Sequence, residues 1–268
     1  MIFQRRFSCR SLLSYFAWIA IWLALDGCYP EGPPVAPERA IRSLTELLHD
    51  PHSEVRRAAA ESLGKIGDPK TAAALLGVLS DQEPRVRAAA ALAIGRLGPS
   101  GGEKAAQAVV EALDDHDELV QRAAVIAISE LEPAPRVLAS VAKFLSAKEV
   151  STRRSVTQAL SMIDARPWLP DLVKVLQDGD AEVRQNAVVA LAELGDPNIA
   201  PLLRDRLIRD PSAAVRSEAA FRLGKIADPD TIKVLAASAN QDRDPVVRRW
   251  AQGGLDNVRS SSGSDSMR

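Results

Sequence analysis

Seven copies of one short segment, spaced between 31 and 34 residues apart, constrain the fold of this chain more than any other feature. The clearest copies contain a Val-Arg pair followed by small residues, and they begin at Val55, Val86, Val183 and Val215. Weaker copies begin at Val120, Thr152 and Val247. We call these seven residues the anchors. Self-similarity at such a period is typical of solenoids, in which each repeat packs against its neighbours along the chain.

Each repeat is predicted to be a pair of α-helices. Four, eight and eleven residues after an anchor the chain carries apolar residues such as Ala59, Leu63 and Ile66, a spacing that marks one face of a helix. Another amphipathic stretch precedes each anchor, and a proline such as Pro69 separates most repeats at the start of the next first helix. Strand patterns are absent. We therefore expect an all-α solenoid of about seven helix pairs over residues 37–259, followed by a disordered tail over 260–268.

This combination of period, Val-Arg anchors and paired amphipathic stretches resembles the HEAT-repeat family, especially the short bacterial type first associated with phycobilisome-chromophore lyases. The resemblance covers residues 37–259. It implies an α-solenoid, but the family includes many activities.

Acidic and basic residues recur at fixed distances from the anchors. An Asp stands five residues before most anchors and an Arg one residue after them; the clearest members are Asp50, Asp81, Asp178, Asp210, Arg56, Arg87, Arg184 and Arg216. The HEAT resemblance implies a structural ladder rather than acid–base catalysis, in which Asp caps the second helix and meets an Arg of the same or the adjacent repeat. Gln121, Ala147 and Thr152 depart from the pattern, so the ladder should be interrupted at repeats three and four. The interruption leaves room for a bend or a site there.

The first 27 residues have the pattern of a secretory signal peptide. Arg5, Arg6 and Arg10 precede an uncharged, largely apolar run of 15 residues that ends at Leu25, which is shorter than the roughly 20 residues needed to span a bilayer. Residues 25–28 resemble the bacterial lipoprotein signal-peptide box, although Asp26 departs from it. This resemblance implies cleavage and lipidation at Cys28, a Pro-rich tether over 28–36, and a membrane-anchored protein of the cell envelope. A plain signal peptide or an uncleaved anchor is the alternative.

Residues that could carry chemistry are scarce. The three histidines, His49, His52 and His116, are predicted to lie in surface turns without metal-ligand spacing, and loss of the leader would leave Cys28 as the only thiol. No phosphate-binding loop or nucleophile motif is present. We therefore predict no catalytic residues, no metal and no cofactor, and hence a protein that is not an enzyme.

The second helices should expose one face to a concave groove. At 100° per residue, the second, sixth and ninth positions after each anchor lie opposite the core. The candidate partner-binding residues at the second and sixth positions are Arg57, Leu92, Arg122, Ile126, Arg154, Val189, Phe221 and Arg249. Small residues at the ninth position, such as Gly64, Gly95 and Gly224, would let a ligand backbone approach closely. Burial of the apolar members by curvature of the solenoid is the alternative.

Location and groove together favour a membrane-tethered scaffold that binds a protein or peptide partner. The alternative is a lyase or assembly factor resembling the phycobilin-lyase HEAT proteins. Nucleic-acid binding is not expected, because the formal net charge is -1 and Glu61, Glu130 and Glu193 lie on or beside the predicted groove.

Overall fold

The structure of the chain is a computed structural model, and it describes residues 37–131, 137, 140–226 and 229–265. Two compact units divide the chain at residues 42 and 43, so the second unit holds all of the repeats except residues 37–42 of the first one. The predicted signal peptide, Cys28 and the tether lie outside the described residues. They therefore stay predictions.

The repeats form helix pairs, as predicted. The second helices, each containing its anchor, are α3 (Ser53–Ile66), α5 (Pro84–Arg96), α7 (Glu118–Leu131), α9 (Val150–Leu160), α11 (Ala181–Glu193), α13 (Ala213–Leu223) and α15 (Pro245–Asp265). The first α-helices are α2 (Pro37–Leu47), α4 (Ala72–Val78), α6 (Glu103–Glu111), α10 (Leu169–Val175), α12 (Ala200–Arg209) and α14 (Pro229–Gln241). The described part of the chain is helical and contains no strand, so the all-α solenoid is confirmed.

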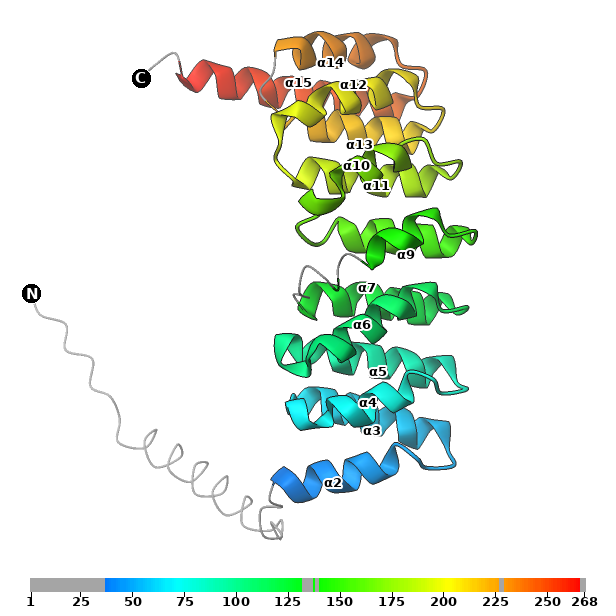
Figure 1. Cartoon of the computed structure of the whole chain (residues 1–268). Coiled ribbons are helices and arrows are strands. Elements are labelled where there is room, and N and C mark those ends of the chain that lie inside the picture. The colour runs from blue at the N-terminus through cyan, green and yellow to red at the C-terminus, as the bar shows by residue number, and fades with distance from the viewer. Residues whose placement is uncertain (1–36, 132–136, 138–139, 227–228, 266–268) are drawn as a thin grey trace, which may run out of the picture. The chain divides into compact units, whose positions relative to one another are not determined.

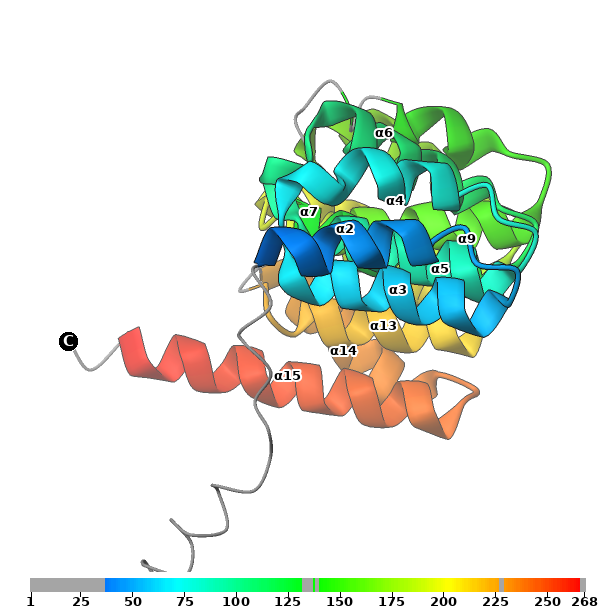
Figure 2. The ribbon, with the colours of Figure 1, turned by 90° about the horizontal axis from the view of Figure 1, so that it is seen from below.

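The second unit stacks its helices in sequence order from α3 to α15 (Figure 1). Seen along the stack, α4 and α6 lie on one side of α3 and α5, which separates the first helices from the second helices (Figure 2). The core lies between these two layers. The residues eight positions after the anchors, from Leu63 in α3 to Leu255 in α15, are at most 4% exposed. This periodic burial of apolar surface drives each helix onto its neighbours.

The joints between repeats differ in detail from the sequence prediction. Short 3-10 helices with a proline in the first or second position precede the next α-helix, as in η2 (Pro69–Thr71), η6 (Arg166–Trp168) and η7 (Pro197–Ile199). In the fourth repeat, Val137 is helical between residues that lie outside the described part of the chain, and the 3-10 helix η5 (Val141–Ser146) follows and buries Val141 and Leu145. The tail also differs, because α15 continues as a helix to Asp265 where disorder was expected from residue 260. Residues 260–262 are serines, which weaken a helix without terminating it.

The prediction for the ninth position was wrong. A Cβ atom added to Gly64 would lie 2.7 Å from the Cα of Ala93, and one added to Gly95 would lie 2.7 Å from the Cα of Ala127. The Cβ of a side chain at Gly224 would meet Gly254 in the same way, at 2.4 Å. These glycines therefore face the next second helix rather than a ligand. They allow neighbouring second helices to pack at close range.

Replacing Gly95 with Ala should therefore destabilise the protein by about 2 kcal/mol, because the added methyl group overpacks the interface between α5 and α7. Gly77 in α4 is the matched control, since it is also helical and nothing lies within 4 Å of an added Cβ. Gly77→Ala should leave stability unchanged or raise it by up to about 1 kcal/mol through helix propensity. Urea denaturation followed by circular dichroism measures both. Equal effects of the two substitutions would contradict the packing role.

The Asp and Arg residues join each repeat to the next one. An Arg in one second helix donates two hydrogen bonds to the carboxylate of the Asp in the following repeat, at ion-pair distances between 2.6 and 2.9 Å. The pairs among the described residues are Arg56 with Asp81, Arg87 with Asp115, Arg153 with Asp178, Arg184 with Asp210 and Arg216 with Asp242. Each of these arginines also donates to backbone carbonyls in the turn before its own helix, as Arg56 does to Asp50. One side chain thus fixes both its own turn and the neighbouring repeat.

The role of the aspartates differs from the expected helix cap. Each carboxylate accepts a hydrogen bond from the backbone N–H two residues later, as Asp81 does from Glu83 and Asp210 from Ser212. These amides belong to the residues that precede the second helices, so the aspartates order the turn rather than cap the helix itself. The hydrogen bond that Arg56 donates to Asp81 holds the pKa of the Asp81 carboxyl below its ordinary value. The ladder is therefore ionised at neutral pH.

The ladder is interrupted between repeats three and four, where both partners are replaced. The third repeat carries Gln121 in place of Arg, and the fourth carries Ala147 in place of Asp. Gln121 keeps the bond to its own turn by donating to the carbonyl of Asp115 at 2.7 Å, and its side chain also contacts Ser151 and Ser155 of the next repeat at 3.3 Å. Thr152 of the fourth repeat also donates to the Asp114 carboxylate of the third at 2.7 Å. These single hydrogen bonds replace a bidentate ion pair, which is the stronger interaction.

Removing one partner of the most buried ladder pair should be costly. The Asp210 carboxylate is fully buried and the Arg184 side chain is 8% exposed. Arg184→Ala should lower the free energy of unfolding by about 3 kcal/mol, because it leaves the buried Asp210 charge with Arg206, at 3.6 Å, as its only remaining ion-pair contact among the described residues. Arg209→Ala, which removes an exposed partner of Asp205, should cost less than about 0.5 kcal/mol in the same urea titration. A cost for Arg184→Ala as small as that of the control would contradict the ladder's role.

Candidate functional site

The outward surface of the second helices forms the candidate site. We call it the second-helix face and define it by the residues one position before and two, three, six and ten positions after each anchor. Four of the most exposed large apolar side chains in the described chain lie on this face, namely Leu119, Ile126, Val246 and Trp250, which are 42–50% exposed. Leu92, Val189 and Phe221 are half-buried on the same face. Curvature of the solenoid thus covers the apolar positions only in part.

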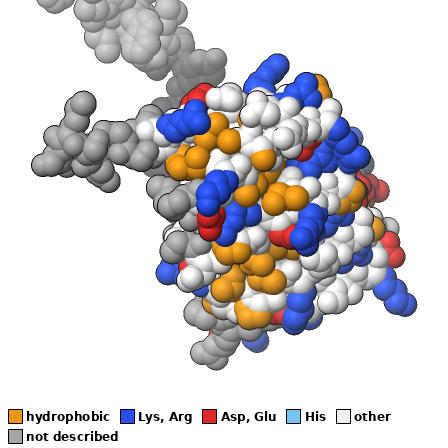
Figure 3. All heavy atoms as spheres, turned by 90° about the horizontal axis from the view of Figure 1, so that it is seen from above, with side chains coloured by type: hydrophobic (Ala, Val, Ile, Leu, Met, Phe, Trp, Pro, Cys, Tyr) orange, Lys and Arg blue, Asp and Glu red, His pale blue; other side chains and the backbone are white. Residues whose placement is uncertain are grey.

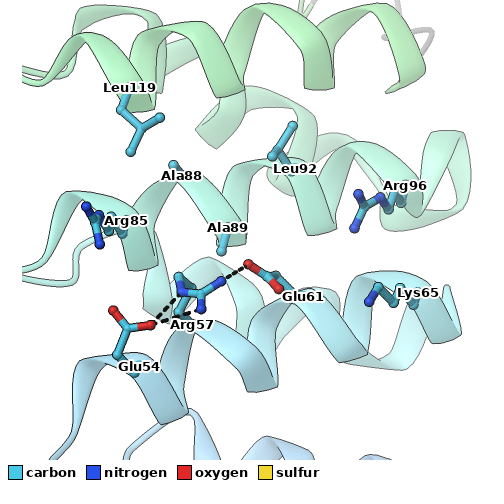
Figure 4. Close-up of a pocket in the computed structure, with 10 residues that line it drawn as sticks. All are labelled: Glu54, Arg57, Glu61, Lys65, Arg85, Ala88, Ala89, Leu92, Arg96 and Leu119. Carbon is cyan, nitrogen blue, oxygen red and sulfur yellow. Dashed lines mark hydrogen bonds and ion pairs between the residues drawn. The ribbon is translucent and has the colours of Figure 1, made fainter.

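Two hollows lie on this face. The first, of about 440 Å³, is formed by α3, α5 and α7, with Ala88, Ala89, Leu92 and Leu119 between charged side chains (Figure 4). The second, of about 530 Å³, is formed by α11, α13 and α15 and includes Phe221, Val246 and Trp250. The end of the stack that holds α14 and α15, seen from above, also shows apolar side chains gathered in patches between Lys and Arg (Figure 3). Apolar surface with a charged rim is typical of interaction sites.

The second hollow contains a pair of aromatic rings. The rings of Phe221 and Trp250 meet edge to face, with centroids 5.2 Å apart and an angle of 72° between their planes. Lys225 places its Nζ atom 4.6 Å from the Phe221 ring centroid, and the Arg222 guanidinium lies 5.4 Å from it. The Phe221 ring is therefore half-buried by its neighbours rather than freely exposed. Trp250 is the more accessible of the two rings, at 45%.

Sequence reasoning missed Trp250. It stands three residues after the last anchor, a position that holds small or polar residues such as Ala89 and Glu218 in the other repeats. In the structure this position points toward the preceding second helix, which brings Trp250 of α15 onto Phe221 of α13. A comparison of the third positions alone would have singled out Trp250 as an unusually large residue.

The candidate arginines fall into two groups. Arg57 is bound by Glu54 and Glu61 of its own helix, and Arg154 is bound by Asp180 at 2.6 Å and Glu182 at 3.2 Å. The hydrogen bond from Arg154 lowers the pKa of the Asp180 carboxyl to about 2. Arg122 and Arg249 are exposed and form no ion pair within the described part of the chain. Of the candidate partner-binding residues, Arg57, Leu92 and Phe221 line hollows. The others line neither of these two, namely Arg122, Ile126, Arg154, Val189 and Arg249.

A search for other chemistry among the described residues gives little. No group of three or more His, Cys, Asp or Glu residues in this part of the chain could hold a metal ion. His49, His52 and His116 are exposed in turns, and His52 contacts the Asp50 carboxylate at 3.1 Å. Among the described helices, none is both long and apolar enough to cross a membrane. The second-helix face is thus the principal candidate that the described residues offer.

Comparison with known proteins agrees with this architecture. The HEAT repeats family matches residues 32–95, 75–161 and 169–256, so the chain belongs to this family. No curated protein matches the chain. The fold is similar to importin beta, with 17% identity, a TM-score of 0.61, and coverage of 83% of this chain and 35% of that one. The Escherichia coli protein YibA gives 19% identity, a TM-score of 0.56, and coverage of 96% and 99%.

A further similarity is to the complex of CpcE and CpcF of phycocyanin lyase from Nostoc sp. PCC7120. The identity is 22% and the TM-score 0.48, with 86% of this chain and 98% of that chain covered. Importin beta and YibA share the fold of this chain and nothing beyond it at these identities.

Two tryptophans provide a test of the described site. Trp168, in η6, is only 4% exposed, whereas Trp250 is 45% exposed. Trp168→Ala should lower the free energy of unfolding by about 3–5 kcal/mol, as large-to-small changes in a core do. Trp250→Ala should cost less than about 1.5 kcal/mol, because it removes mainly the contact with Phe221. Chemical denaturation measures both, and a cost for Trp250→Ala as large as that for Trp168→Ala would assign Trp250 to the core.

Proposed function

We propose that this protein is an exported, lipid-anchored scaffold whose second-helix face binds a segment of a partner protein. The observation that carries the proposal is the aromatic pair of Phe221 and Trp250, which lines an open hollow instead of the core. Exposing large apolar side chains costs free energy in water unless something covers them. Aromatic residues at the centre of a contact surface are also the residue types that most often dominate binding energy.

The kind of partner follows from the form of the face. Its apolar residues are distributed from α5 to α15 instead of converging on one enclosed cavity. A compact small molecule would contact one hollow, whereas an extended or helical segment can contact many repeats at once. The scaffold requires no converging acid, base or nucleophile. A lyase or assembly activity, the alternative drawn from the family resemblance, would require a bound chromophore or client at the same face.

Cross-linking tests the binding face. A photoreactive residue at Val246, which is 50% exposed beside Trp250, should capture a partner in intact cells. Trp250→Ala should reduce the recovery of that partner roughly 30-fold, which corresponds to the loss of about 2 kcal/mol typical of a binding anchor. Ile208→Ala is the control, because Ile208 is 60% exposed but lies on α12, a first helix. If Ile208→Ala and Trp250→Ala have the same effect, the second-helix face is not the binding surface.

Metabolic labelling tests the anchor. Wild-type protein should incorporate palmitate, and Cys28→Ser should not, since the lipid is proposed to be attached to that thiol. Cys9→Ser is the matched control, because Cys9 would be removed with the signal peptide and its loss should leave labelling unchanged. Equal labelling of wild type and Cys28→Ser, or none in either, would remove the lipoprotein proposal without affecting the binding face.

A further inference from the structure

We infer that the first hollow, formed by α3, α5 and α7, selects an acidic stretch in the bound segment, with an apolar side chain between its carboxylates. This inference rests on the proposed function and adds the chemistry of the partner to it. The argument uses the charges that line the hollow, their pairing and their positions along α5.

The hollow carries more positive than negative charge. Four basic side chains line it, Arg57, Lys65, Arg85 and Arg96, against two acidic ones, Glu54 and Glu61. Arg57 forms ion pairs with both glutamates, so a single cation pairs with the two acidic side chains. Lys65, Arg85 and Arg96 have no hydrogen-bonding or ion-pair partner among the residues that the structure describes. The cations at the rim are therefore available to carboxylates from another chain.

The positions of Arg85 and Arg96 define the length and the residue pattern of a segment that could bind between them. Arg85 and Arg96 stand at opposite ends of α5, and Ala88, Ala89, Leu92 and Leu119 lie between them (Figure 4). Eleven residues of helix place the two backbone positions about 16 Å apart. An extended segment covers that length in about five residues. A segment with two carboxylates about five residues apart and an apolar residue between them would thus match the rim and the floor together.

Arg122 and Arg249 are also unpaired on this face among the described residues but line neither hollow, so a surplus of unpaired cations around an apolar floor is a feature of the first hollow. Farther along the face, Arg154 is already bound by Asp180 and Glu182. The second hollow is lined by one basic residue, Arg222, and two acidic ones, Glu218 and Asp244, and Arg222 is bound by Glu218. Acidic residues of a partner would be repelled or unpaired there. Electrostatic complementarity therefore places them over α5.

The same features favour a peptide over other anions. Nucleic-acid binding draws its affinity from the neutralisation of many phosphates along a chain, whereas this hollow has a surplus of two charges and keeps Glu54 and Glu61 on its rim. The floor is apolar, which suits a buried side chain rather than a chain of phosphates. A flat lipid surface cannot reach a floor that lies between helices. An acidic peptide with an apolar residue can pair its carboxylates with the basic rim and place its apolar side chain on the floor.

The experiment selects peptides from a random 12-residue display library on the full chain. The tested variant is Arg85→Gln/Arg96→Gln. Its matched control is Lys174→Gln/Arg209→Gln, which removes the same charge from exposed positions on α10 and α12. Selected peptides are then synthesised with a fluorophore, together with versions in which Asp and Glu are replaced by Asn and Gln. Fluorescence anisotropy measures their affinity in 50 and 300 mM salt, and phosphatidylglycerol vesicles are tested in parallel.

We expect wild type and the control to enrich peptides with paired acidic residues around an apolar one. Neutralising those acids should weaken binding roughly tenfold, as the loss of charge-assisted hydrogen bonds would, and high salt should weaken it as well. Arg85→Gln/Arg96→Gln should lose the acidic preference but still bind peptides.

Each other outcome is decisive. Peptides without acidic enrichment whose binding is lost in Trp250→Ala would overturn this inference and leave the proposed function intact. No enrichment by the wild type would overturn both. Vesicle binding that depends on Arg85 and Arg96, without an acidic preference among peptides, would assign the hollow to a lipid surface instead.

Discussion

The arginine that reaches from one repeat to the aspartate of the next is the interaction on which the stack depends. Its guanidinium binds a carboxylate in the neighbouring repeat and carbonyl oxygens in its own turn, so it sets the position of both. These pairs are mostly buried. In the interior, the cost of desolvation offsets much of the attraction between the charges, so such a pair contributes more to the relative positions of the two repeats than to the free energy of unfolding. Burial is the largest single influence on the Asp210 carboxyl and raises its pKa, but the hydrogen bonds from Arg184 and the Ser212 amide, together with the charges of Arg184 and Arg206, outweigh it and lower that pKa. The ladder therefore keeps its charges in the interior because each one is paired.

The close approach of the second helices explains why a binding face exists at all. Glycine and alanine fill the contacts between neighbouring second helices, as Gly64 does against Ala93 and Gly95 against Ala127. Larger residues in these helices must therefore point to the core or outward. The core positions are occupied by one apolar residue per turn, and the outward positions are left to Leu92, Ile126 and Phe221. The face is thus a direct result of how tightly the helices are packed.

Much of the fold could be predicted from the sequence because a repeat provides the same signal seven times. The anchors predicted the position of the second helix in each repeat. Gln121 in place of Arg and Ala147 in place of Asp located the break in the ladder. Contacts between repeats were harder to predict. Spacing alone left the direction of the Arg–Asp pairing open, and it placed Gly64 and Gly95 on a groove although they lie at a helix interface. Trp250 was missed because its role depends on a neighbour 29 residues earlier in the chain. Helical periodicity assigns a residue to a face, but only packing shows which residue of another helix it meets.

The break between repeats three and four has a consequence for how the chain responds to force and to binding. A linear array is held together by terms between adjacent units, and cooperativity passes along it only as well as the weakest of them allows. At this junction, the hydrogen bonds of Gln121 and the one that Thr152 donates to the Asp114 carboxylate take the place of a bidentate ion pair. Repeats one to three and repeats four to seven should therefore behave as two rigid blocks, with the more flexible junction between repeats three and four. One hollow lies on each side of that junction. The angle between the two blocks therefore sets the distance that a partner segment must span to contact both hollows.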